Sequence, residues 1–263
     1  MAEALIKKAE KEKNRWFVSE EQKARNAAEY FEQAGNIYKA KKTYKPAAEC
    51  FVRAAALNMK VDRGYDAAGL YKAAGIMLKL GKDPTYMVHF NRAVELYAEL
   101  GKGSQAAKLS KDLGEQAERE RNWDDALVHY QLAADLQRGE GSDSSARQSL
   151  EKVALFTAQT AQSSENYTKA AALFEEIGTE SLTTRLGKYS AKKHFFKAIL
   201  CLMASGDAIA SQAKHDQFSQ TQHQFATSRE GKFLQQVISA LADFNGSAFS
   251  AAYRGTFPSG FTS

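Results

Sequence analysis

Few residue combinations in this chain have the spacing that catalysis requires. The stretch from Gly75 to Gly81-Lys82 is close to a phosphate-binding loop, but five residues instead of four separate the glycines, and Asp83 stands where Ser or Thr would bind magnesium. Ser190-Ala-Lys-Lys193 matches the S-x-x-K pattern of a serine nucleophile, yet no S-D-N or K-T-G companion exists. We therefore expect no nucleotide site in the first segment and a solvated helix turn in the second.

Metal and thiol chemistry are equally poorly supported. The five histidines, at positions 89, 129, 194, 215 and 223, never fall at H-E-x-x-H spacing. Two cysteines are too few for a disulfide framework or a four-cysteine zinc site. Cys50 and Cys201 have no evident His and acid partner, so we expect buried small side chains. The sequence thus predicts no enzyme, no metal and no cofactor.

Composition favours a helical protein of the cytoplasm. The chain has 263 residues, 25% charged, and only three prolines. No run of about 18 apolar residues could span a membrane, and the N-terminus has no secretory signal. The net charge of +5 and the pI of about 9.0 permit an anionic partner. Nucleic acid ranks low, because a lysine-rich tail and an aromatic-glycine motif are both missing.

One pattern recurs about every twenty residues. Each copy has a small residue, a bulky apolar residue four positions on, and a small or apolar residue seven positions on, which together form one helix face. The clearest copies are Ala27/Phe31/Ala34, Ala47/Phe51/Ala54 and Ala67/Tyr71/Ala74. Looser copies are Tyr86/Phe90/Ala93, Ala106/Ser110/Leu113, Ala126/Tyr130/Ala133, Ala146/Leu150/Val153, Ala170/Phe174/Ile177 and Ala191/Phe195/Ala198.

A helix every twenty residues predicts a hairpin every forty. Since no hairpin can bury its apolar face alone, the hairpins must stack into an α-solenoid of tetratricopeptide type. An irregular bundle with chance spacing is the alternative. The pattern weakens after residue 205, one more helix is predicted over 229–243, and the stretch from Asn245 either docks its aromatic residues or frays.

Three segments carry a family resemblance. Residues 142–154 read S-D-S-S-A-R-Q-S-L-E-K-V-A, residues 186–201 read L-G-K-Y-S-A-K-K-H-F-F-K-A-I-L-C, and residues 227–232 read T-S-R-E-G-K. In this order and spacing the chain resembles the soluble NSF attachment proteins, or SNAPs, of the alpha and beta types. The resemblance covers about residues 1–244 and is strongest from 123 to 202.

The resemblance implies both architecture and function. Family members have a twisted sheet of helical hairpins followed by a C-terminal helical bundle, here residues 1–187 and 188–263. Several copies wrap an assembled SNARE four-helix bundle of syntaxin- and synaptobrevin-type proteins. They recruit the NSF hexamer, an AAA+ ATPase that disassembles the bundle in vesicle fusion and intracellular protein transport. We therefore expect a non-enzymatic, cytoplasmic adaptor that associates peripherally with membranes.

Basic residues at family-like positions would attract the acidic surface of a SNARE bundle. The family lysine near residue 148 is replaced by Gln148, so a neighbouring arginine would supply that charge. For each basic residue the alternative is a solvated helix face. The predicted SNARE contacts are Lys42, Lys79, Lys108, Arg147 and Lys192, with Leu186 as an apolar contact.

Two further surfaces follow from the resemblance. Trp16 and Phe17 occupy the region of a family loop that holds the protein on a bilayer, although here it is shorter and lacks glycines. Alternatively, they pack the first helix onto the second. The acidic NSF-facing surface retains Asp207 and Asp243, while its other positions are Ser239 and Ala242.

The C-terminus departs from the family pattern. The sequence does not include the family's D-x-W-containing helix or its acidic, leucine-ended tail that stimulates NSF, so we expect either a truncation relative to the family or a divergent paralogue. We therefore expect SNARE-bundle binding to carry over more fully than NSF stimulation. Two rival hypotheses remain open: a tetratricopeptide-like scaffold that binds an extended peptide unrelated to SNAREs, and an enzyme of unknown class, for which no polar pocket is evident.

Overall fold

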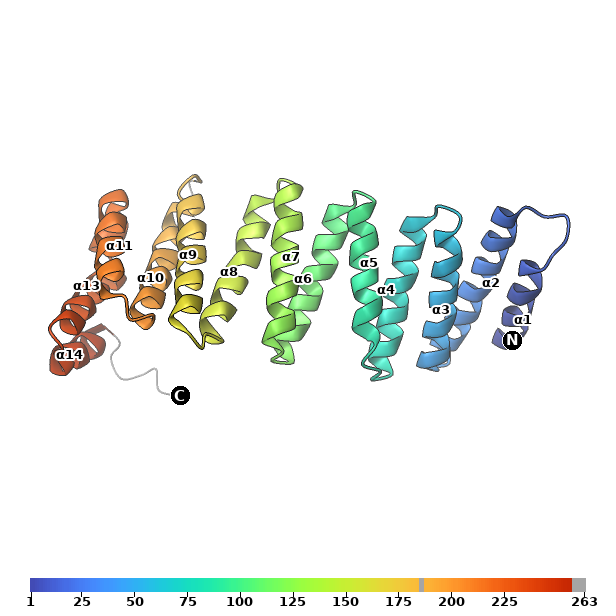
Figure 1. Cartoon of the computed structure of the whole chain (residues 1–263), viewed down its shortest axis with the longest axis horizontal. Helices are drawn as coiled ribbons and strands as arrows, with labels where there is room; N and C mark the ends of the chain where they lie inside the picture. The colour runs from blue at the N-terminus through green and yellow to red at the C-terminus, as the bar shows by residue number, and fades with distance from the viewer. Residues whose placement is uncertain (185–186, 257–263) are drawn as a thin grey trace. The chain divides into compact units, whose positions relative to one another are not determined.

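The structure is a computed structural model that describes residues 1–184 and 187–256 (Figure 1). In these ranges it contains helices and no strand, which confirms the predicted all-α class. The helices are α1 Ala2–Lys13, α2 Glu20–Ala40, α3 Tyr44–Met59, α4 Gly64–Leu80, α5 Tyr86–Glu99, α6 Gly103–Arg119, α7 Trp123–Gly139, α8 Asp143–Gln159, α9 Ser164–Ser181, α10 Gly187–Ala204, α11 Ala208–Thr221, α12 His223–Thr227, α13 Arg229–Ala242 and α14 Gly246–Thr256.

The twenty-residue pattern corresponds to one helix per copy, from α2 through α10. Its three positions are buried in every copy, except that Tyr71 and Tyr86 are half-buried. Small residues at the first position let neighbouring helices approach closely, and the bulky residue fills the space between them. The predicted array of helical hairpins is therefore confirmed.

The chain divides into two compact units. Unit 1 consists of Met1–Leu113 and Asp135–Ser142, and unit 2 consists of Gly114–Ala134 and the described residues from Asp143 onward. The predicted domain boundary after residue 187 stays a prediction. Each unit has its own hydrophobic core, and the two are described separately below.

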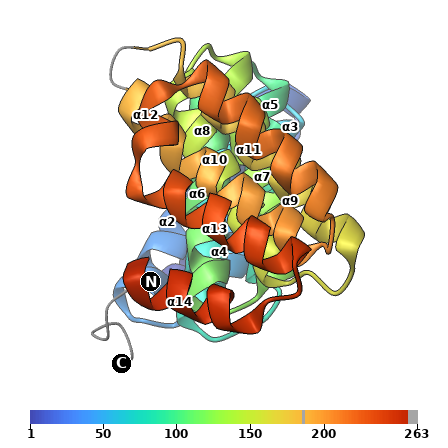
Figure 2. The ribbon, with the colours of Figure 1, turned by 90° about the vertical axis from the view of Figure 1, so that its left-hand side faces the viewer.

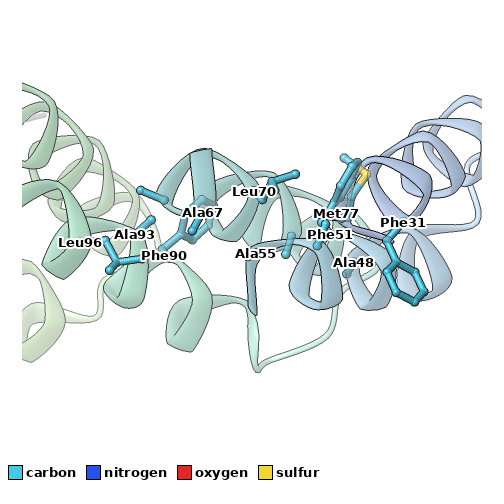
Figure 3. Packing of buried hydrophobic residues seen from close by; sticks show 14 of the residues in the cluster. Phe31, Ala48, Phe51, Ala55, Ala67, Leu70, Met77, Phe90, Ala93 and Leu96 are labelled. Atoms are coloured by element: carbon cyan, nitrogen blue, oxygen red, sulfur yellow. The ribbon is translucent and has the colours of Figure 1, made fainter. Parts of the chain in front are cut away.

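The core of unit 1 is built from alanines and a few large side chains, which interdigitate between α2, α3, α4 and α5 (Figure 3). Glycine provides the closest approaches. A Cβ on Gly35 would lie 2.7 Å from the Phe51 ring, and one on Gly75 would lie 3.0 Å from Phe90. Because each glycine follows the first pattern position by eight residues, the same contact recurs in successive hairpins.

The short connections share one hydrogen-bonded turn. After α2, Lys42 has a φ of 57° and the Thr43 N–H donates to the Tyr38 carbonyl at 3.0 Å, which is a Schellman C-cap. This geometry favours glycine, since a side chain in the left-handed region is strained. The left-handed residues at helix ends are Lys42, Asp62, Lys82, Gly101, Arg121, Gly141, Gly206 and Phe244.

The core of unit 2 is richer in aromatic rings. Helices α10, α11 and α13 contact one another (Figure 2), and the rings of Phe195 and Phe218 stack with centroids 4.1 Å apart. Phe225 lies edge-on to both rings. The helix predicted over 229–243 is confirmed as α13, although Leu241 is exposed. The stretch from Asn245 forms α14, which packs on α13.

Candidate partner-binding surfaces

Two predicted basic contacts share one end of unit 1. Lys42 is exposed in the connection after α2, and Lys79 is exposed in the last turn of α4. A Cβ on Gly81 would lie 3.2 Å from Tyr44, so the connections after α2 and α4 are adjacent. Lysine at a helix C-terminus also interacts favourably with the helix dipole. The structure therefore groups these two lysines at one end of the hairpins.

Lys108 lies on the exposed face of α6. Its neighbours on both sides, Ala107 and Leu109, are buried in the core, so the lysine side chain points to solvent. This placement makes Lys108 a suitable position for a charge substitution, because the core of unit 1 does not depend on it.

The predicted contacts of unit 2 are less exposed. Arg147 of α8 is half-buried, and Lys192 of α10 is half-buried with its Nζ 3.8 Å from Glu230 of α13. Leu186, the predicted apolar contact, lies outside the described residues. Arg147 and Lys192 therefore project from different helices, and only Arg147 lines a cavity of about 650 Å³ between α8, α9 and α10.

Ion pairs between helices secure unit 2. Each pair joins helices that are not consecutive, and each lysine also lies over an aromatic ring. The pairs are Lys152–Glu118 at 2.7 Å, Lys197–Glu151 at 2.7 Å and Lys214–Glu175 at 2.6 Å, and the rings are Phe156, Phe174 and Phe218 respectively. These lysines are thus partly neutralised, in contrast to Lys108.

Glu118 is the most connected of these carboxylates. It accepts hydrogen bonds from the Tyr130 hydroxyl and the Lys152 ammonium, both at 2.7 Å. Burial acts to raise the pKa of Glu118, but the two hydrogen bonds outweigh burial and lower it. Burial and the bond to Glu118 raise the pKa of Tyr130.

The connection between α1 and α2 exposes two large aromatic side chains. Trp16 is 83% exposed and Phe17 is fully exposed, so neither packs α1 onto α2. Phe17 also has a φ of 63°, a left-handed conformation that is unfavourable for a bulky residue. Phe17 thus combines two unfavourable features, an exposed apolar ring and a left-handed backbone conformation.

The two predicted acidic contacts occupy opposite helix ends. Asp207 caps α11, where its carboxylate accepts a hydrogen bond from the Ala210 N–H at 2.8 Å. Asp243 follows the last residue of α13 and is exposed. Asp207 therefore has a structural task that any test of partner binding must separate from its charge.

The candidate chemical residues have structural explanations. Both cysteines are buried, and burial raises the pKa of the Cys50 and Cys201 thiols to about 11, so they stay protonated at neutral pH. Asp83 accepts bonds from the hydroxyl and N–H of Thr85, at 2.6 and 3.0 Å, and these bonds lower its pKa. Over the two described ranges, the side chains form no group of three or more potential metal ligands.

Comparison with known proteins identifies the family. The family profile described as "Soluble NSF attachment protein, SNAP" matches residues 1–255. The chain belongs to this family. It is 34% identical over 230 residues to the beta-soluble NSF attachment protein of Bos taurus, covering 87% of this chain and 75% of that relative. It is 32% identical over 234 residues to the mouse alpha-soluble NSF attachment protein, covering 88% and 77%.

A fungal relative extends the comparison. The vesicular-fusion protein SEC17 of Komagataella phaffii is 29% identical over 218 residues, covering 82% of this chain and 73% of that protein. The predicted resemblance to SNAPs is thus confirmed. Among the helices described, none combines the length and apolar character needed to cross a bilayer.

Some features of these SNAP surfaces were beyond sequence reasoning. The partners of Glu118 and Glu151 lie on other helices and share no motif with them. The cavity beside Arg147 is likewise formed by three helices. Phe17 is different, because an aromatic pair in a short polar connection is a recognisable signal of an exposed surface.

Proposed function

We propose that this chain is an adaptor that binds assembled SNARE bundles and recruits NSF for their ATP-driven disassembly. The observation that carries the proposal is the family match over residues 1–255. The exposed basic residues Lys42 and Lys108 support it, because cations with no carboxylate partner among the described residues suit an acidic partner. Syntaxin- and synaptobrevin-type proteins are the proposed SNAREs, and the adaptor itself catalyses nothing.

A disassembly assay tests the proposal. The chain is mixed with purified NSF, ATP and a preassembled SNARE complex, and loss of the complex is followed at two salt concentrations. Lys108→Glu should weaken SNARE binding about tenfold, and added salt should weaken binding by the wild type. Lys7→Glu is the matched control, since Lys7 is an exposed lysine of α1 outside the proposed contacts.

The outcomes separate the two halves of the proposal. Salt-sensitive SNARE binding without disassembly would locate the defect in NSF recruitment. Equal binding by wild type and Lys108→Glu would remove Lys108 from the contact surface. No binding to the SNARE complex at either salt concentration would contradict the proposed function.

For NSF recruitment, we propose Asp207 and Asp243 as contacts. Asparagine at position 207 can still cap α11, whereas alanine cannot. Asp207→Asn should therefore weaken NSF recruitment without loss of stability, and Asp207→Ala should reduce both. If Asp207→Asn recruits NSF as well as the wild type, Asp207 acts only as a helix cap.

We also propose that Trp16 and Phe17 insert into the membrane interface, which would place the adaptor peripherally on membranes. Both rings are exposed, aromatic residues favour the membrane interface, and the net charge of +5 suits an anionic lipid surface. Phe17→Gly removes the ring but fits the left-handed φ, so it should reduce flotation with anionic vesicles while the fold is retained. Unchanged flotation of Phe17→Gly, and of Trp16→Ser, would contradict membrane insertion.

A further inference from the structure

A cavity in unit 2 has features that SNARE binding does not require. Its volume is about 650 Å³, within the range of small-molecule sites. Residues of α8, α9 and the first turns of α10 line it. Polar side chains in the lining include those of Ser144, Arg147, Gln148, Glu151, Ser190 and His194.

The charge in this cavity is positive. Arg147 has no carboxylate partner anywhere in residues 1–184 and 187–256. The one carboxylate in the lining, Glu151, is 2.7 Å from the Lys197 ammonium, which offsets its charge. The N-terminus of α10 adds the positive end of a helix dipole, since that helix begins at Gly187 in the lining.

A buried polar atom in the lining lacks a protein partner. His194 is 7% exposed, and its Nδ1 makes no hydrogen bond with any described residue. The nearest carboxylate oxygen is that of Glu151, at 4.0 Å, which is beyond hydrogen-bonding distance. Buried polar groups in proteins are almost always satisfied, so this nitrogen is available to a bound group.

Neutral hydrogen-bonding groups complete the lining. Ser144 and Gln148 of α8 line the cavity and are exposed, and neither makes a hydrogen bond within the described ranges. The Ser190 hydroxyl donates to the Gly187 carbonyl at 2.9 Å and retains lone pairs for an incoming donor. These groups can form hydrogen bonds with the hydroxyls of a small polyol.

We propose that this cavity binds a small molecule bearing one phosphate group, with Arg147 as the ion-pairing residue and the neutral groups holding the rest of the molecule. A planar guanidinium can bind two phosphate oxygens, and a helix N-terminus favours the same anion. The remaining volume exceeds what a single phosphate fills. A sugar phosphate therefore matches the site better than the free ion.

Titration of the whole chain tests the site without any SNARE. Inorganic phosphate and glucose 6-phosphate are the probes, and amide NMR shifts of α8 and α10 report binding at constant ionic strength. Glucose 6-phosphate should bind at least about fivefold more tightly than inorganic phosphate. Arg147→Gln should weaken both about tenfold, as expected for loss of a charge-assisted pair.

A matched variant controls for net charge. Lys193→Gln removes the same charge from an exposed position of α10 that does not line the cavity, so it should change binding less than twofold. Absence of saturable shifts with either probe would overturn the proposal. So would equal weakening by Arg147→Gln and Lys193→Gln, because binding would then follow overall charge and not the site.

Discussion

Unit 1 and unit 2 solve the same packing problem with different side chains. In unit 1 the helices meet mainly through alanine and glycine packed against rings, as at Gly35 and Phe51, and an ion pair between Arg53 and Glu10 joins α3 to α1. In unit 2 several rings meet one another, and lysine–carboxylate pairs join helices that are not consecutive. A repeated contact between glycine and a ring thus characterises unit 1, whereas unit 2 relies more on contacts among rings and on lysine–carboxylate pairs between helices.

The two units differ in how many helices a single core substitution affects. In unit 1, Phe51 of α3 packs against Gly35 of α2, so a change at either residue alters a contact between two neighbouring helices. In unit 2, Phe195 touches Phe218 and also lies near Phe225, so one substitution affects three helices.

The largest effect is expected for Phe195→Ala. Its ring is buried and stacked, so truncation should lower the free energy of unfolding by about 3–5 kcal/mol. Phe51→Ala in unit 1 should cost about 1 kcal/mol less, because no ring pair is lost there. Denaturant unfolding followed by circular dichroism measures both. Equal losses would remove the contrast between the units.

The next largest loss of stability is expected when a glycine at a helix crossing is replaced by alanine. A Cβ on Gly178 would lie 2.6 Å from the Phe195 ring, which is held against Phe218 and cannot move freely. Gly178→Ala should therefore cost about 1–3 kcal/mol, despite a helix-propensity gain of about 1 kcal/mol. Gly35→Ala should cost less, since among the described residues no second ring is stacked on Phe51.

Gly139→Ala is the control for this pair. No atom lies within 4 Å of a Cβ built there, so thermal unfolding should show a neutral or slightly higher melting temperature. A loss at Gly139 as large as at Gly178 would show that contact with the ring does not set the cost.

Substitutions at the left-handed residues after α2 and α10 should change the free energy of unfolding in opposite directions. Lys42 holds a left-handed φ of 57°, so Lys42→Gly should raise the free energy of unfolding by up to about 1 kcal/mol. Gly206 in unit 2 has a φ of 85°, and Gly206→Ala should lower it by about the same amount. Chemical denaturation compares the two. Destabilisation by Lys42→Gly would mean that the lysine side chain stabilises the fold.

The smallest effect concerns pH. The pKa of Glu118 is lowered from its ordinary value of 4.5, so its ionised form stabilises the folded state above that pH. This contribution should disappear as the pH falls through the folded-state pKa. Because the Lys152 side chain is 40% exposed, solvent screening limits the effect to about 0.5 kcal/mol.

Glu118→Gln tests the pH effect by difference. The variant should lose about 0.5 kcal/mol at neutral pH and match the wild type in acid, as measured by unfolding at both pH values. Loss of stability that is the same at both pH values would assign the effect of Glu118 to its hydrogen bond with Tyr130 alone.

Sequence reasoning predicted the repeated part of the fold well. Ala27, Phe31 and Ala34 are buried because their spacing alone places them on one helix face, and the same holds through α10. The Schellman turns were less visible, since only Gly101, Gly141 and Gly206 among the left-handed residues are glycines. Lysine or aspartate at the equivalent positions gives no such signal.

The site was harder to predict, for a different physical reason. Lys108 could be placed on a surface because its buried neighbours define its face. The role of Asp207 as a cap and the pairing of Lys192 with Glu230 depend on where α11 and α13 lie, which no local spacing encodes. The ring arrangement around Phe218 is of the same kind.

The Schellman turns also limit how the connections between helices can change in length during evolution. A three-residue connection such as Lys41–Thr43 has its backbone tied to the preceding helix, so an inserted residue would break the cap and shift the next hairpin. The connection from Asn14 to Ser19 carries no such bond across its middle. Insertions and deletions among relatives should therefore be concentrated between α1 and α2, where a change in length leaves the twenty-residue spacing of the later helices unchanged.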